Sequence, residues 1–260
     1  MRRSIPILSV VAAVLATAAG AAAAATLIGT GAADRLLGTP EPDQIYGEAG
    51  ADMISGAGSS DYLEAGADDD QVDGGAGVDL VLGGTGNDRV DAGTGDDVVY
   101  AGAGDDLVLG GQGRDTLFGQ ADSDRLFGGA GRDRIYASLG DDFVDAGSGS
   151  DRVSAEGPAT VLAGGGRDVV TSSGGSVTVQ GGGGSDRIRT GELADTVSGG
   201  AGLDAIATGG GDDHVDVRDG LRDRVDCGAG ANDEVELDVS DVVTGCERMS
   251  AGRAIPRRIR

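Results

Sequence analysis

The residues of this sequence with the clearest chemical potential are aspartates that recur at a fixed interval. An aspartate stands at every ninth position, and an aliphatic side chain follows each of them two residues later. The unbroken series is Asp34, Asp43, Asp52, Asp61, Asp70, Asp79, Asp88, Asp97, Asp106, Asp115, Asp124, Asp133, Asp142 and Asp151. A fold that brings these carboxylates together places like charges side by side, which raises their pKa unless cations neutralise them.

Calcium is the cation that this composition suits best. Ca²⁺ accepts six to eight oxygen ligands at about 2.3–2.6 Å in flexible geometry, whereas Mg²⁺ demands a near-octahedral shell and retains its waters. The aspartates supply charge, and the glycines that precede each of them form turns whose carbonyl oxygens are exposed. The net charge of −24 calls for a cationic ligand, and it argues against nucleic acid, whose phosphates need a basic surface.

The nine-residue interval divides into a glycine-rich turn of six residues and a strand of three. Glycine suits the turn because the chain must adopt positive φ there, and the central aliphatic residue of the strand points inward while its neighbours point outward. Two units form one coil, so every second aspartate of the series stacks on one side, with coils about 4.8 Å apart. The 3% of aromatic residues are too few for a conventional core, but stacked coils need only small aliphatic residues.

The best copies of the unit read GGAGVDLVL (74–82), GGTGNDRVD (83–91), GGQGRDTLF (110–118) and GGAGRDRIY (128–136). This pattern resembles the RTX, or haemolysin-type, calcium-binding nonapeptide repeat. The resemblance implies an all-β fold, a right-handed parallel β-roll or β-solenoid, that holds several Ca²⁺ ions between consecutive turns. The ligands that it implies are the carboxylates of Asp79, Asp97, Asp115, Asp133 and Asp151, with main-chain carbonyls at turn positions such as Gly74, Gly83, Gly110 and Gly128.

The two sides of the expected solenoid differ in their turns. The side of Asp79 to Asp151 has glycine at the second and fourth turn positions throughout, so we expect the best calcium sites there. The opposite side contributes Asp88, Asp106 and Asp142, but Asp68 and Asp122 replace the fourth-position glycine of two of its turns. Farther along, GGGGSD (181–186) and GGAGLD (199–204) place Asp186 and Asp204 on one side and predict a further site.

The chain divides into five segments by pattern. Residues 1–25 have the charge and hydropathy of an export signal, with a retained membrane anchor as the alternative. Residues 26–153 form the regular roll. Residues 154–184, where the interval loses one residue and Val177 replaces an aspartate, are expected to be calcium-poor coils. Residues 185–250 form a second repeat block that ends in a cap, and residues 251–260 form a basic tail that we expect to be disordered.

The remaining chemistry is sparse. Cys227 and Cys246 are the only cysteines, and an isolated pair in an exported chain predicts a disulfide that staples the cap. Closely spaced carboxylates follow from the repeat itself, so they give no evidence of acid–base catalysis, and no catalytic motif is present. The tyrosines, at positions 46, 62, 100 and 136, look too scattered to form a platform for carbohydrate.

These observations predict a secreted, extracellular, monomeric protein that binds calcium, folds when Ca²⁺ binds and is not an enzyme. The alternative is a calcium-dependent adhesin or a surface-layer or matrix component that uses the rod as a spacer. A cell-wall or surface polymer is then the further candidate partner.

Overall fold

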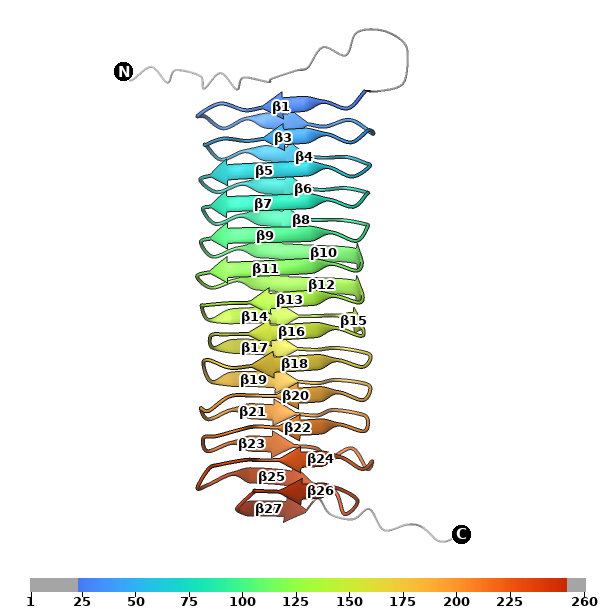
Figure 1. Cartoon of the computed structure of the whole chain (residues 1–260), viewed down its shortest axis with the longest axis vertical. Coiled ribbons are helices and arrows are strands. Elements are labelled where there is room, and N and C mark those ends of the chain that lie inside the picture. The colour runs from blue at the N-terminus through green and yellow to red at the C-terminus, as the bar shows by residue number, and fades with distance from the viewer. Residues whose placement is uncertain (1–22, 252–260) are drawn as a thin grey trace, which may run out of the picture.

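The computed structural model describes residues 23–251, and over this range the chain forms an elongated solenoid built from strands (Figure 1). The expected signal segment and basic tail therefore lie almost wholly outside the described residues. No helix among residues 23–251 has the length and apolar character needed to cross a membrane.

One side of the solenoid is a parallel sheet of 13 strands, in which each strand pairs with the strand one coil away. We call it the odd sheet. Its strands, in hydrogen-bonding order, are β1 (Thr26–Ile28), β3 (Gln44–Tyr46), β5 (Tyr62–Ala67), β7 (Leu80–Thr85), β9 (Val98–Ala103), β11 (Thr116–Ala121), β13 (Arg134–Ala137), β16 (Arg152–Ala155), β18 (Val169–Ser172), β20 (Arg187–Arg189), β22 (Ala205–Ala207), β24 (Arg224–Asp226) and β26 (Val242–Thr244).

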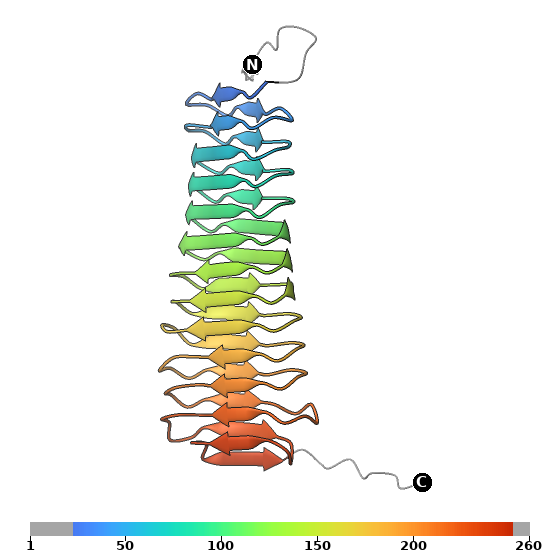
Figure 2. The ribbon, with the colours of Figure 1, turned by 45° about the vertical axis from the view of Figure 1, so that its right-hand side comes forward.

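The other side is a parallel sheet of 14 strands, which we call the even sheet. Its strands are β2 (Arg35–Leu37), β4 (Met53–Ser55), β6 (Gln71–Asp73), β8 (Arg89–Asp91), β10 (Leu107–Gly113), β12 (Arg125–Gly131), β14 (Asp142–Asp145), β17 (Ala159–Leu162), β19 (Val177–Gln180), β21 (Thr196–Ser198), β23 (His214–Asp216), β25 (Glu234–Leu237) and β27 (Arg248–Ala251), with β15 (Ser148–Gly149) paired to β12. Figure 2 shows strands of both sheets stacked along the rod axis.

The core is a column of small aliphatic side chains that alternation along the strands directs inward. Leu117, for example, is fully buried between two outward-facing neighbours on β11. Its register partner on β13 is Ile135, the equivalent residue of the next coil. The predicted parallel solenoid with two repeat units per coil is thus confirmed, because the register of the sheets follows the aliphatic period in every regular repeat.

The register changes at one place inside the rod. Asp142 on β14 pairs with Ala159 on β17, which comes one residue sooner than a regular coil allows, and the same shortening separates Arg152 on β16 from Val169 on β18. Both pairings share the turn at residues 156–158, between β16 and β17, so this turn contains the missing residue. The sheets continue on both sides of it, and the predicted disulfide between Cys227 and Cys246 closes the last coils with Cα atoms 5.2 Å apart.

Candidate metal centre

The aspartates of the repeat form two continuous rows, one along each line of turns. Within a row, the backbone N–H of each aspartate donates to Oδ1 of the aspartate one coil later. Asp97 N–H thus bonds Asp115 Oδ1 at 2.9 Å, and Asp115 N–H bonds Asp133 Oδ1 at 2.9 Å. Each carboxylate therefore uses one oxygen to join two coils, which fixes its side chain toward the interior of the turn.

The row that precedes the odd sheet, which we call the Asp79 row, runs unbroken along the solenoid. Its members are Asp43, Asp61, Asp79, Asp97, Asp115, Asp133, Asp151, Asp168, Asp186, Asp204, Asp223 and Asp241. It passes through the shortened coil, where Asp151 N–H bonds Asp168 Oδ1 at 2.8 Å. The candidate ligands Asp186 and Asp204 thus belong to the same row as Asp79 to Asp151.

The row that precedes the even sheet, which we call the Asp88 row, is interrupted. It comprises Asp34, Asp52, Asp70, Asp88, Asp106, Asp124 and Asp142, and then Asp195, Asp213 and Asp233. Ala159 and Val177 stand at the two positions between, and the amide of Asp142 donates instead to the carbonyl of Pro158. Across residues 154–184 the two sides of the rod therefore differ, since only the Asp79 row continues there.

The second carboxylate oxygen of the row aspartates is buried without a hydrogen-bond partner. In the described chain, Oδ2 is an orphan in every aspartate of both rows from Asp52 to Asp233. Leaving a buried acceptor unsatisfied costs about 1–3 kcal/mol, and more when it is charged. An oxygen-seeking cation would satisfy these atoms, so this row geometry fits calcium.

Backbone oxygens approach the orphan atoms at the first position of the turns that begin with glycine. A Cβ placed on Gly110 would lie 2.8 Å from Asp115 Oδ2 and 2.7 Å from the carbonyl oxygen of Gly128, one coil later. Gly74, Gly83 and Gly128 border the same pairing of an orphan Oδ2 with a carbonyl oxygen. In these turns an orphan Oδ2 and a carbonyl oxygen of the next coil thus border the same point, while the turns of Asp97 and Asp151 have alanine there, Ala92 and Ala146.

Side chains alone do not make these sites. No group of three or more acidic, histidine or cysteine side chains within residues 23–251 is arranged to hold a metal ion. The remaining oxygen ligands must therefore come from the glycine-rich backbone. That combination suits Ca²⁺, which accepts carbonyl oxygens readily.

Burial raises the pKa of the row aspartates in the metal-free fold. Loss of hydration, with a smaller contribution from the charges of Asp133 and Asp97, outweighs the lowering effect of the Asp97 amide and raises the pKa of Asp115 from 3.8 to about 7. The same cause raises the pKa of Asp106 to about 7 and that of Asp79 to about 6. At neutral pH such carboxylates are poised either to keep a proton or to exchange it for a metal ion.

In the first turn of each row the protein itself supplies donors to Oδ2, a feature that sequence reasoning missed. The amide and hydroxyl of Thr30 donate to Asp34 Oδ2 at 2.6 and 2.8 Å. The amide of Thr39 donates to Asp43 Oδ2 in the same way. Threonine at the second turn position is the signal that distinguishes these turns, and it marks them as closures of the rows.

The turns that lack glycine keep the same backbone shape. Asp68 and Asp122, at the fourth turn position, have φ of 78° and 72°, and Gln120, at the second, has φ of 81°. The carboxylate of Asp122 also accepts a hydrogen bond from the amide of Gly104 in the preceding coil, at 3.2 Å. The substitutions therefore retain the turn at a cost in backbone strain, about 1 kcal/mol per residue.

The tyrosines are less scattered than the sequence suggests. Tyr100, Phe118 and Tyr136 occupy one row on the outer face of the odd sheet, because they are register partners in consecutive coils. Their rings stack with centroids 4.6 and 4.7 Å apart and interplanar angles of 3° and 6°. The faces of the rings are thus used within the ladder, which is a means of joining strands.

Comparison with known families matches most of the solenoid. The model of the RTX calcium-binding nonapeptide repeat (4 copies) matches residues 28–63, 50–81, 82–117, 118–153, 162–197 and 190–220, which together exceed half of the chain. Among curated proteins, no sequence matches the chain. The gap between the matches, residues 154–161, coincides with the shortened turn and the first missing aspartate of the Asp88 row.

Proposed function

The chain belongs to the RTX calcium-binding nonapeptide-repeat family, and we propose that it is a secreted, non-catalytic protein whose solenoid folds when Ca²⁺ binds between consecutive turns. The observation that carries the proposal is the orphan Oδ2 on every row aspartate from Asp52 to Asp233. Even about 1 kcal/mol at each would exceed the net stability of an ordinary domain, about 5–15 kcal/mol. A bound cation would therefore stabilise the fold at these atoms.

Bound Ca²⁺ supplies the positive charge that the buried carboxylates lack. The residues that would hold it are row aspartates such as Asp97, Asp115 and Asp133, with carbonyl oxygens of turn residues such as Gly110 and Gly128. Binding free energy then becomes folding free energy, because the unfolded chain has no preformed site. At low calcium, repulsion within a chain of net charge −24 opposes compaction, and a chain in that state remains suited to export.

The Asp79 row is where we place the strongest sites. It is continuous, and its turns from Gly74 to Asp151 have glycine at the positions of positive φ, as in Gly111 and Gly113 with φ of 102° and 135°. The Asp88 row contributes sites around Asp88, Asp106 and Asp142, and we propose that residues 154–184 hold calcium on one side only. The second repeat block, residues 185–250, adds sites through Asp186 and Asp204.

The rod shape supports the second candidate function, that of an adhesin or a surface-layer or matrix component. Thirteen stacked strands at about 4.8 Å each give a rod about 60 Å long. Such a rod can serve as a spacer as well as a calcium store. Calcium-dependent retention on cell-wall material would favour this function.

The test is a calcium titration of the chain from residue 26 onward, followed by circular dichroism, with Mg²⁺ as the control cation. We expect a cooperative transition from coil to β structure with Ca²⁺ alone. A chain that is fully folded in chelator, or that folds equally well with Mg²⁺, would contradict the proposal. Equilibrium dialysis at the end point would count the bound ions and compare them with the orphan oxygens.

A further inference from the structure

The arginines of this acidic chain gather along one line of the solenoid. Seven of them line a series of open pockets of about 460, 620 and 510 Å³ on the odd-sheet side: Arg132, Arg152, Arg167, Arg187, Arg189, Arg222 and Arg224. Neighbouring pockets share residues, since Arg167 and Arg187 line both of the first two and Arg187 and Arg224 line both of the last two. We call this continuous strip the arginine groove.

The repeat places these side chains by position. Except for Arg189, the groove arginines occupy the residue before or the residue after an aspartate of the Asp79 row, as Arg132 and Arg152 do beside Asp133 and Asp151. At the equivalent position before the aspartates of the Asp88 row stand Asp69, Asp105 and Asp141. Along the groove itself, Asp141 and Asp212 stand at this position on the Asp88 side, whereas the Asp79 side has Arg132, Arg167 and Arg222.

The groove arginines form no ion pairs with carboxylates among the described residues. Among the described residues, none of the seven lies within 4.0 Å of a carboxylate oxygen. Arg114, just before the groove, shows what a partnered arginine looks like here, because it holds Asp96 with a bond at 3.0 Å from its Nε. The other guanidinium groups keep their donors free for a ligand.

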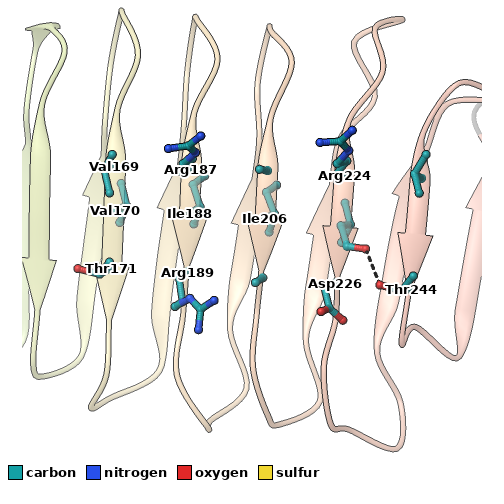
Figure 3. Close-up of a pocket in the computed structure, with 14 residues that line it drawn as sticks. Val169, Val170, Thr171, Arg187, Ile188, Arg189, Ile206, Arg224, Asp226 and Thr244 are labelled. Carbon is teal, nitrogen blue, oxygen red and sulfur yellow. Dashed lines mark hydrogen bonds between the residues drawn. The ribbon is translucent and has the colours of Figure 1, made fainter.

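Strand β22 gives the groove its smallest outward side chains. Ala205 on this strand pairs in register with Arg187 on one side and Arg224 on the other, so two guanidinium groups flank a methyl group (Figure 3). Since each strand is about 4.8 Å from the next, these two arginines stand about 10 Å apart along the axis. Arg189 and Asp226 flank Ala207 in the same way on the next row. This is a slot for a chain of anionic groups that follows the rod.

We propose that the arginine groove binds a linear acidic polysaccharide, with its carboxylates held by the arginines. A guanidinium group binds carboxylate through two parallel hydrogen bonds, and a solenoid repeats this donor along a straight line. No aromatic side chain lines the described pockets, and single-stranded nucleic acid binding relies on stacking of bases on such rings. The net charge of −24 also opposes the denser charge of a nucleic acid.

The inference rests on the proposed function in one respect, because the groove exists only in the folded, calcium-loaded chain. Calcium in the Asp79 row would also neutralise the carboxylates directly behind the groove. We therefore expect the polysaccharide to bind only after calcium has folded the chain.

The test uses short oligo-uronates, which do not gel with calcium, and fluorescence anisotropy at saturating Ca²⁺. The variant is Arg187→Gln with Arg224→Gln. The matched control is Arg35→Gln with Arg89→Gln, since these exposed arginines occupy the same slot after an aspartate on the even sheet. We expect the groove variant to bind at least about tenfold more weakly with a shallower dependence on salt, and the control to bind as the unaltered chain does.

Circular dichroism of the same samples separates the two proposals. If calcium fails to fold the unaltered chain, the proposed function fails. If the folded chain does not bind oligo-uronate, or if both variants weaken binding equally, the groove assignment is overturned while the calcium proposal stands. Tighter binding of single-stranded DNA than of oligo-uronate through the same arginines would overturn the choice of polysaccharide.

Discussion

Replacement of Asp115 by asparagine should change stability in opposite directions with and without calcium. The asparagine keeps an oxygen that accepts the Asp97 amide, which Asp115 Oδ1 accepts at 2.9 Å, and it removes the charge on the orphan Oδ2. Because the side chain is fully buried, the effect of this charge is not diluted by solvent. A structural hydrogen-bonding role and a metal-binding role thus predict different outcomes.

The magnitudes follow from the burial and the metal linkage. The rise of the Asp115 pKa from 3.8 to about 7 corresponds to about 4 kcal/mol at about 1.4 kcal/mol per unit, and this penalty acts on the metal-free fold above pH 7. The asparagine removes this penalty, so in chelator the variant should show at least as much β structure as the unaltered chain. At a calcium concentration about 100 times the dissociation constant, one site contributes about 2.7 kcal/mol, and the variant should lose about that amount.

The assay is urea unfolding at saturating calcium and circular dichroism in chelator at pH 8. Asp91→Asn is the matched control, since Asp91 lies on the outer face of β8 and its replacement changes the net charge equally. The control should leave the calcium midpoint nearly unchanged. If Asp115→Asn destabilised the chain equally in both solutions, or left the calcium midpoint where it was, the carboxylate would be a structural element only and the reasoning would be refuted.

Three further predictions test other features. In chelator, the raised pKa of residues such as Asp106 means that the folded chain binds protons more tightly than the unfolded chain. The stability of the fold is therefore greatest below about pH 4 and is lost as pH rises through 7. Acidification from pH 8 to 5 should accordingly increase the β structure that circular dichroism detects. Gln120→Gly should stabilise the calcium-loaded chain by about 1 kcal/mol in urea unfolding, because the residue has φ of 81°. The Cys227–Cys246 disulfide joins residues 19 positions apart, and closing a loop of that length stabilises a fold by about 3 kcal/mol. Reduction of this disulfide should therefore speed hydrogen exchange in β24 to β27 but not around Asp115.

The sequence was sufficient for the fold because one interval serves three purposes. An aliphatic residue such as Leu117 must face inward, an aspartate such as Asp115 must reach its row, and the glycines between coils must turn the chain. All three recur with the same period, so only one register satisfies them together. Few other folds allow such a reading, because their contacts do not repeat.

Three features of the structure were not predicted from the sequence, because they depend on where individual turns and side chains lie in the rod. The sequence shows that one residue is lost between Asp151 and Asp168, but not that the turn between β16 and β17 absorbs it and leaves the Asp79 row intact. The roles of Thr30 and Thr39 required the hydroxyl and amide positions. The ladder through Phe118 could have been found, since its members recur once per coil at the same position of the repeat.

The arrangement of charge in this rod follows from the same coil geometry that makes the metal sites. Each regular coil buries one row carboxylate per side and exposes the residues that flank it, so the flanking positions can be varied without altering the row. At the position before the row aspartate, the Asp79 side has arginines such as Arg132 and Arg167, and the Asp88 side has Asp105 and Asp141. Since stacked coils interact mainly with their neighbours, such a surface can lengthen or shift along the axis while every coil keeps its row aspartate. Calcium binding and the charge of the outer surface are therefore separable by mutation, which is the premise of the paired arginine variants.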